Sequence, residues 1–344
     1  MTAAPKLRFQ DRQIEMAHGA GGKASRRLVE GLIAPLLLGG TSEPLGDAAM
    51  VAMNGSTVAI TADSFVVKPL RFPGGSIGEL AVNGTVNDLA VSGAKAEAIV
   101  VTYVIEAGLP TETLEAEVRA MADAASKAGV SIVGGDTKVV EHGKADSLYI
   151  TTAGIGRPIP GVSLSARSVR PGDVVILSGP IGDHGVTILL ARGELDFEAE
   201  LRSDTRTVWP YVEAMAAAAA PGLRWMRDPT RGGVATSLNE LARDSRLSIA
   251  VEESRIPVRD AVRGACELLG LDPLHIANEG QFLAVVASDY GDRAVAALRR
   301  AGCCDAAIIG AVREQPAGTV LGSTGYGGTR VIDMLVGDPL PRIC

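Results

Sequence analysis

The segment DSFVVKPLRFPGGSIGELAVNGTVNDLAVSGAKA, residues 63–96, decides the fold class of this 344-residue chain. It follows the apolar run VAIT at 58–61, which predicts a strand. After two glycines, Ser76 and Glu79 have the spacing of a capping box, and the apolar stripe that follows predicts a helix. The stripe consists of Ile77, Leu80, Ala81 and Leu89. A strand, a glycine turn and a capped helix in this order are typical of a mixed α/β protein.

The same alternation continues along the rest of the chain. A second helix is predicted from Thr111 to Gly129, because acidic residues fill its first turn and a glycine follows its apolar stripe. We expect this helix to bury Leu114, Val118, Met121 and Ala125. Further strands are predicted at 98–105, 130–133, 148–154, 174–177, 283–287 and 307–312. Further helices are predicted to begin at Val186 and directly after residues 231–233.

A region rich in proline and glycine, GIGRPIPGVSLSARSVRPGD at 154–173, separates two stretches with this pattern. Because 344 residues are many for a single core, we expect two α/β domains. The expected bounds are 1–155 for an N-terminal domain, 156–173 for a linker, 174–336 for a C-terminal domain and 337–344 for a flexible tail.

The composition excludes several functional classes. The chain carries 33 basic and 40 acidic side chains, which give a net charge of −7, and no block of lysine or arginine. Only 3% of its residues are aromatic, so few side chains could stack on nucleic-acid bases. No apolar run is long enough to cross a membrane. The four cysteines, at 266, 303, 304 and 344, form no metal-binding or disulfide pattern, and we expect reduced thiols. We therefore expect a soluble cytoplasmic protein that binds neither nucleic acid nor membrane.

The chain ends in GDPLPRIC, with a cysteine, Cys344, as its last residue. Pro339 and Pro341 favour an extended chain, so the eight residues from Gly337 could span about 25 Å. A terminal cysteine in a hydrophobic core would bury its charged carboxylate, which argues against a role in packing. The tail is either an ordinary exposed end or a carrier that brings a thiol to a distant cleft.

The motif HGAGGK, from His18 to Lys23, places glycines between a histidine and a lysine. Glycines let backbone N–H groups close around an anion, and the lysine can balance phosphate charge. The motif lacks the full spacing of a P-loop, so a flexible loop without ligand is an equal alternative.

Three aspartates lie beside apolar or glycine-rich segments, namely Asp63, Asp88 and Asp136. Carboxylates that gather repel one another unless a hard cation joins them, and Mg²⁺ bridging to nucleotide phosphates is the usual arrangement. Each of them alone could equally be a turn or cap residue. Their joint occurrence favours a site for a nucleotide with Mg²⁺.

Other polar residues lie at glycine-bearing turns. Lys138 follows Asp136 closely, and Glu279 precedes an apolar strand; either could be an ordinary surface charge. Two strand-to-helix turns contain Asp183 with His184 and, further on, Arg227, Asp228 and Arg231. Such turns present polar groups to a cleft but also serve as ordinary helix caps.

Several motifs occur together and in order along essentially the whole chain. They are HGAGGK, the segment 63–96, GGDTKVV, SGPIGDHG, RDPTRGGVA, ANEGQF and the terminal PRIC. In this combination the chain resembles the hydrogenase-maturation carbamoyl dehydratases, which belong to the superfamily of aminoimidazole-ribonucleotide synthetase and selenophosphate synthetase. The resemblance implies a homodimer of two-domain PurM-like protomers whose N-terminal domains bind ATP with Mg²⁺.

The resemblance also implies the reaction. In that family a carbamoyltransferase, HypF, loads a carbamoyl group onto the terminal cysteine, here Cys344, and ATP drives its dehydration to a thiocyanate. The cyanide then passes to iron on a HypC–HypD scaffold and becomes a ligand of [NiFe]-hydrogenase. Lys138 and Glu279 match the family positions that assist deprotonation of the nitrogen, with Glu279 as the expected base. The implied Mg²⁺ ligands are Asp63, Asp88 and Asp136. The implied nucleotide site consists of His18, Gly19, Gly21, Gly22, Lys23, Asp63, Asn87, Asp88, Gly135 and Asp136.

Other functions need other residues. Selenophosphate synthetase would need a reactive cysteine or selenocysteine near the glycine loop, and this chain has no cysteine before Cys266. Aminoimidazole-ribonucleotide synthetase or thiamine-phosphate kinase would not need a terminal thiol. A non-catalytic carrier that only displays Cys344 to its partners remains an alternative, and such a carrier would not couple ATP hydrolysis to modification of the tail.

Overall fold

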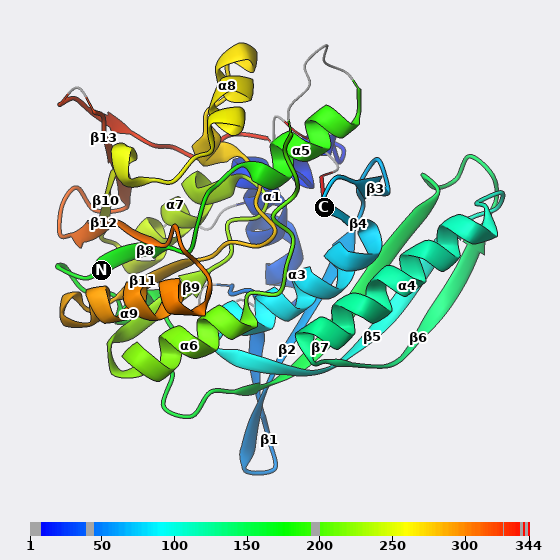
Figure 1. The fold of residues 1–344 in the computed structure, drawn as a ribbon, viewed down its shortest axis with the longest axis horizontal. Coiled ribbons are helices and arrows are strands. Elements are labelled where there is room, and N and C mark those ends of the chain that lie inside the picture. The colour runs from blue at the N-terminus through cyan, green and yellow to red at the C-terminus, as the bar shows by residue number, and fades with distance from the viewer. Residues whose placement is uncertain (1–7, 39–44, 194–199, 326, 338–339, 341–342) are drawn as a thin grey trace.

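The computed structural model of the chain describes residues 8–38, 45–193, 200–325, 327–337, 340, 343 and 344. It shows a mixed α/β architecture with two sheets (Figure 1). The described N-terminal part contains the 3-10 helix η1 (Met16–His18), the π-helix η2 (Val29–Ile33) and the α-helices α1 (Gly22–Leu28) and α2 (Ala34–Leu37). The predicted fold class is confirmed.

The first sheet has the strand order β1-β2-β7-β5-β6. Its strands are β1 (Ala49–Met53), β2 (Ser56–Phe65), β7 (Leu148–Pro158), β5 (Ala94–Glu106) and β6 (Ser131–Val140). Neighbouring strands are antiparallel except β5 and β6, which are parallel. The helices α3 (Ile77–Val91) and α4 (Thr111–Ala128) cover one face, and a small hairpin of β3 (Arg71–Phe72) and β4 (Gly75–Ser76) precedes α3. Most of the side chains on β1 and β6 are exposed.

The local signals in the sequence correctly place both helices. The Ser76 side chain caps α3 by accepting a hydrogen bond from the Glu79 amide, and α4 ends at Gly129, which has a φ of 65°. The expected burial of Val118 is wrong, because its side chain is 43% exposed. Glu117 is buried in its place, where its carboxylate pairs with Arg71 and accepts a hydrogen bond from the Gly78 amide.

The second sheet has the strand order β14-β13-β10-β12-β8-β11-β9. Its strands are β8 (Val174–Leu177), β9 (Leu223–Arg227), β10 (Ser248–Glu252), β11 (Leu283–Val286), β12 (Ala307–Arg313), β13 (Thr319–Ser323) and β14 (Thr329–Val331). The helix α7 (Gly233–Ser245) packs on one face of this sheet. The helices α6 (Trp209–Ala219) and α9 (Ser288–Ala301) pack on the other. Short turns connect these elements, namely η3 (Ala166–Ser168), η4 (Ala220–Gly222), η5 (Glu253–Arg255) and η6 (Pro273–His275).

One hydrophobic core joins the two halves of the chain. The helices α5 (Asp183–Ala191) and α8 (Asp260–Leu269) contribute to the same cluster of buried residues as α3 and the first sheet. Leu340 and Ile343 of the tail are buried in that cluster as well. The helix predicted at Val186 begins at Asp183, and β7 continues to Pro158, inside the segment predicted as a linker. Among the described residues, no helix combines the length and apolar character needed to cross a membrane.

Candidate active site

Three carboxylates from different parts of the chain meet between the two sheets. Asp47 precedes β1, Asp88 lies in α3 and Asp228 follows β9. Their carboxylate oxygens lie within 4.8 Å of one another. The Thr61 hydroxyl lies 2.9 Å from Asp88 Oδ2 and 2.7 Å from the Asp47 carbonyl oxygen, so β2 contacts the Asp88 side chain and the Asp47 backbone. This carboxylate cluster therefore depends on the packing of both halves of the chain.

The electrostatics of the carboxylate cluster favour a cation. Burial and the charges of neighbouring carboxylates raise the pKa of Asp228 to about 8 and the pKa of Asp88 well above its ordinary value. Burial also raises the pKa of Asp47 to about 6, although Arg227 Nε lies 2.9 Å from Asp47 Oδ1. The same guanidinium also pairs with Glu240, at 3.2 Å. The single guanidinium of Arg227 cannot neutralise three carboxylates. Carboxylate oxygens are the ligands that Mg²⁺ prefers, so a bound Mg²⁺ would balance the remaining charge.

The predicted metal ligands are only partly brought together. Asp63 follows Thr61 on the same face of β2, and its charge adds to the burial that raises the pKa of Asp88 and of Asp228. Asp136 lies on β6, and β7 and β5 separate β6 from β2. Its carboxylate pairs with Lys138 of the same strand, at 2.7 Å, and both side chains are exposed. Within one chain, Asp136, Lys138 and the adjacent Gly135 therefore lie apart from the carboxylate cluster.

The glycine loop borders a cavity beside the carboxylate cluster. His18, Gly19, Gly21 and Gly22 line this cavity of about 330 Å³, and Asp228 and Arg227 line it from the other side. His18 itself is buried, with Nε2 at 2.7 Å from Asp11 Oδ2 and Nδ1 accepting a hydrogen bond from the Glu15 amide. The Arg231 guanidinium donates a hydrogen bond to the Gly19 carbonyl oxygen. The loop is thus held by its own side chains next to the carboxylates.

The first turn of α1 contacts the segment that leads into the tail. The Lys23 amide donates to the Leu335 carbonyl oxygen at 3.0 Å, and the Ala24 amide donates to that of Val336 at 3.1 Å. A Cβ on Gly22 would lie 2.4 Å from the Leu335 oxygen, so only glycine permits this approach. These two amides are therefore occupied by the chain itself, whereas the prediction had the loop closing on phosphate.

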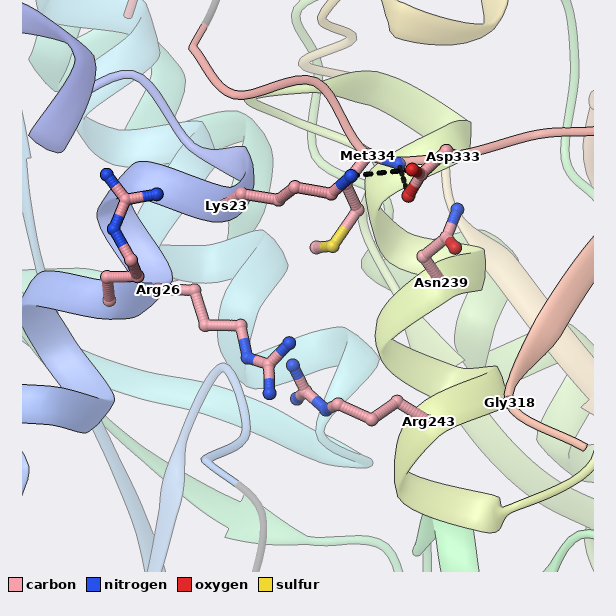
Figure 2. A pocket seen from close by; sticks show the side chains of 8 residues that line it. Lys23, Arg26, Asn239, Arg243, Gly318, Asp333 and Met334 are labelled. Atoms are coloured by element: carbon pink, nitrogen blue, oxygen red, sulfur yellow. Dashed lines mark hydrogen bonds and ion pairs between the residues drawn. The ribbon is translucent and has the colours of Figure 1, made fainter. Parts of the chain in front are cut away.

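A second cavity, of about 440 Å³, lies next to the first and is lined by basic side chains. Figure 2 shows the guanidinium groups of Arg26 from α1 and Arg243 from α7 pointing toward one another, with Lys23 reaching Asp333. The Lys23 ammonium and the Asp333 carboxylate are 2.5 Å apart. Glu30 contacts both guanidiniums, at 3.0 Å and 3.4 Å. Arg26 and Arg243 line both cavities and can therefore attract an anion to either.

Glu279 is buried within reach of the charges of Asp228 and Asp63. Its amide donates to Asp204 Oδ1 at 3.0 Å, and its carbonyl oxygen accepts a hydrogen bond from Asn87 Nδ2 at 3.1 Å. Its Oε1 is buried and has no hydrogen-bond partner among the described residues. Burial, together with the charges of Asp228 and Asp204, raises the pKa of Glu279 well above its ordinary value. Since Lys138 lies on the distant strand β6, the structure does not bring the predicted pair together within one chain.

The described residues of the tail are docked on the protein. The Val66 amide donates a hydrogen bond to the main-chain oxygen of Cys344 at 3.0 Å, and His184 Nε2 lies 2.7 Å from the Ile343 carbonyl oxygen. Cys344 is half-buried and forms no disulfide. Figure 1 shows this end of the chain beside β3 and β4. The residues 338–339 and 341–342 of the predicted flexible tail lie outside the described residues.

Two family models match the chain. The N-terminal domain of AIR synthase related proteins matches residues 45–157, and the C-terminal domain of the same proteins matches residues 170–322. The carbamoyl dehydratase HypE of Azotobacter vinelandii is 46% identical over 98% of this chain and 99% of its own length. The chain belongs to the HypE family.

Solved structures of HypE proteins share the fold. The HypE of a HypE–HypF complex has a TM-score of 0.84 and 41% identity, covering 90% of this chain and 99% of that one. HypE in complex with ATP has a TM-score of 0.81 and 40% identity, covering 96% of this chain and 100% of that one. The family identity inferred from the motifs is confirmed.

Two members of the carboxylate cluster were missing from the predicted metal site. Asp47 follows Gly46 ahead of an apolar segment, a pattern similar to that of Asp136, which was selected. Asp228 was recognised only as part of a polar turn after a strand. A search for every aspartate at the junction of a glycine turn and an apolar strand would have found Asp47.

Proposed function

We propose that this chain is an ATP-dependent carbamoyl dehydratase that acts on its own C-terminal cysteine. The substrate is the S-carboxamide of Cys344, the product is a thiocyanate, and the cyano group becomes a ligand of hydrogenase iron. The docked position of the terminus carries the proposal. Cys344 binds Val66, three residues beyond Asp63 and thus about 10 Å away along an extended chain. The substrate cysteine is therefore docked at the end of the strand that carries Asp63, whose charge acts on Asp88 and Asp228 of the carboxylate cluster.

The carboxylate cluster and the cavity of the glycine loop are the proposed site for ATP and Mg²⁺. Asp47, Asp88 and Asp228 offer converging hard oxygen donors, with Asp63 nearby. When bound, the cation and ATP would supply a phosphoryl group that turns the amide oxygen into a leaving group. Arg26, Arg231 and Arg243 line the adjoining cavity and would bind and orient phosphate oxygens. A HypE protein has been solved in complex with ATP, which supports ATP as the nucleotide.

Glu279 is the proposed base. Loss of water from a carboxamide removes one oxygen and two protons from the group, both protons coming from nitrogen. A buried carboxylate with a raised pKa accepts such a proton more readily than an exposed one, once it is ionised. The unpartnered Oε1 is the atom available to accept it. Asn87 and Asp204 hold the backbone of Glu279 and so orient this oxygen.

The expected homodimer is supported by the exposed face of the first sheet. That face has an apolar groove of about 150 Å³, and apolar side chains that are normally buried are exposed on it. They include Ile60, Val100, Val133 and Ile155. An apolar area of this kind marks a protein interface. Because Lys138 and Asp136 lie on the edge strand β6, we propose that the dimer brings them to the active site of the partner protomer.

Replacing Val133 by glutamate is expected to dissociate the dimer. Val133 is 65% exposed, so the free protomer tolerates the charge, whereas a buried unpaired carboxylate in the interface costs several kcal/mol. Sedimentation velocity should show a shift from dimer to monomer. Leu268→Glu on α8, at a site that is 71% exposed, is the matched control and should remain a dimer. A monomeric wild-type chain, or a dimeric Val133→Glu chain, would contradict this interface.

Replacing Asp228 by asparagine is expected to weaken Mg²⁺ binding and to stabilise the metal-free chain. The folded pKa of Asp228 is about 8, above the ordinary 3.8, so stability is lost as pH rises through this interval. At pH 8 the variant should gain about 1 kcal/mol or more in free energy of unfolding without metal, since one pKa unit corresponds to about 1.4 kcal/mol. Thermal denaturation with and without Mg²⁺ measures both effects.

The control for this experiment is Asp292→Asn, which removes an exposed carboxylate from α9. It should leave the response of thermal unfolding to Mg²⁺ unchanged. If Asp228→Asn keeps the full stabilisation by Mg²⁺, the carboxylate cluster does not bind the cation.

The proposed partners require movement of the tail. A HypE protein is solved with HypF, and by analogy we propose that HypF loads the carbamoyl group onto Cys344. A docked cysteine cannot enter the active site of another protein, so the bonds to Val66 and His184 must break during loading. A HypC–HypD complex is the proposed acceptor of the cyano group.

The deciding experiment follows the mass of the C-terminal peptide. The chain is incubated with carbamoyl phosphate, ATP, Mg²⁺ and the partner transferase. We expect a carbamoyl adduct on Cys344 that then loses the mass of one water. An adduct that never loses water would show a carrier rather than a dehydratase.

A further inference from the structure

His184 is buried at the start of α5 and contacts the last residues of the chain. Its side chain is fully buried, and Nε2 lies 2.7 Å from the carbonyl oxygen of Ile343, the residue next to Cys344. We propose that His184, held by Ser203, is a positioning residue that docks the modified cysteine for dehydration. This inference rests on the proposed function and adds to it the group that determines where the substrate lies.

The hydrogen-bond pattern fixes the tautomer of His184. A carbonyl oxygen can only accept, so Nε2 carries the hydrogen, and Nδ1 accepts from the Ser203 hydroxyl, 2.8 Å away. The Ser203 oxygen in turn accepts from the Thr205 amide at 3.1 Å. Burial lowers the pKa of His184 to about 4, which keeps the ring neutral. Both ring nitrogens are therefore used, and the donor is directed at the tail.

The aromatic ring of Phe72 also restrains His184. The two rings meet edge to face, with their centroids 5.6 Å apart. Ser203 is in turn anchored by its amide, which donates to the Pro73 carbonyl oxygen at 2.9 Å. The hairpin of β3 and β4 thus supports both His184 and the serine that orients it.

The same segment also holds the proposed base. Asp204, next to Ser203, accepts hydrogen bonds from the amides of Glu279 and Gly280 at 3.0 Å and 3.1 Å. Residues 203–204 therefore connect the histidine that holds the tail to the loop that holds Glu279. Through this link, His184 sets the position of the substrate cysteine relative to Glu279. Burial of Ile343 alone would not set that position.

The test compares two substitutions, each of which places a side-chain amide near one of the two ring nitrogens of His184. In His184→Gln the side-chain amide nitrogen can occupy the region of Nε2, and in His184→Asn it can occupy only the region of Nδ1. We expect His184→Asn to slow single-turnover dehydration of the carbamoylated chain about tenfold or more. Loading by the transferase and ATP affinity should stay unchanged. His184→Gln should recover most of the lost rate.

Reactivity of the Cys344 thiol provides a readout that does not need catalysis. Cys266 and Cys303 are buried and Cys304 is exposed, so the measurement uses a Cys304→Ser background. The rate of reaction with an aromatic disulfide reagent should rise about tenfold in His184→Asn and little in His184→Gln. An unchanged thiol reactivity in His184→Asn would overturn the proposal, as would equal dehydration rates in the two variants.

A shortened chain separates docking from general stability. If His184 acts by holding the tail, His184→Asn should lower the melting temperature of the full chain more than that of a chain ending at residue 342. An equal effect in both chains would indicate a structural role and would overturn the proposal. If the wild-type chain forms no thiocyanate at all, the proposed function fails, and the thiol reactivity still decides whether His184 holds the tail.

Discussion

Replacing Cys344 by alanine is expected to abolish thiocyanate formation and to leave ATP binding intact. The sulfur is the atom that carries the carboxamide, so no other side chain can substitute for it. The side chain of Cys344 is half-buried at the end of the chain, so its loss leaves no cavity in the core that would unfold the protein. Mass spectrometry of the C-terminal peptide and calorimetric titration with ATP measure the two properties.

Cys304→Ala is the matched control for this prediction. Cys304 is exposed on the second domain, next to the buried Cys303, and has no part in the proposed site. Its replacement should leave thiocyanate formation at the wild-type level. Thiocyanate formed by the Cys344→Ala chain would refute the assignment of the substrate.

A carrier without catalytic activity makes a different prediction for ATP hydrolysis. In a dehydratase, the carbamoylated chain hydrolyses ATP in proportion to the thiocyanate formed, and the Cys344→Ala chain does not. In a carrier, modification of the tail leaves hydrolysis unchanged. Comparing the phosphate released by the two chains after incubation with the transferase therefore separates the two functions.

The elements that carry local signals could be predicted from the sequence. The capping residue Ser76 and the terminal Gly129 fix the ends of α3 and α4, because these signals act within a few residues. The position of Asp88 at the site follows from the buried helix α3 that carries it. The sequence therefore predicts those features that are determined within a single helix.

The remainder of the site depends on contacts between distant segments. Asp228 follows β9 in the second half of the chain, and only the packing of that half against α3 and β2 brings it to Asp88. Asp136 was expected there because it follows an apolar segment and two glycines, and because the family resemblance implied it as a ligand. The strand order of the sheet instead places it at the edge, a fact that no local pattern encodes.

The position of the tail likewise depends on contacts with distant segments that local sequence patterns do not reveal. The described tail residues 340, 343 and 344 lie outside any helix or strand, as its prolines predict for this segment. Its docked position depends on Val66 and His184, which lie far away in the sequence. Movement of the tail between this position and a partner protein stays a prediction.

Replacing Glu279 by glutamine is expected to lower the dehydration rate about 10²- to 10⁴-fold, the usual effect of losing a general base. In the wild-type chain the rate should rise with pH, because the base must lose its proton and its raised pKa places this rise well above pH 4.5. The glutamine chain should lack that rise. Single-turnover rates of the carbamoylated chains across this pH range measure both effects.

Two inactive variants are expected to restore activity to each other. Glu279 and Lys138 do not meet within one chain, and β6 with Lys138 lies at the edge of the sheet proposed to form the dimer. A heterodimer of Glu279→Gln and Lys138→Ala protomers, isolated with two affinity tags, then contains one site with both residues and one with neither. Its rate should be about half that of the wild-type dimer, while each variant homodimer stays inactive.

The matched control pairs Lys138→Ala with a protomer that carries both substitutions, because this heterodimer has no intact site under either arrangement. If Lys138 instead acted on Glu279 of its own chain, the first heterodimer would be as inactive as its parents, since each protomer would lack one member of the pair. Recovery in the first heterodimer and none in the control therefore requires that the two residues come from different protomers. That result would also explain why an exposed lysine on an edge strand is needed by a base buried in the other half of the molecule.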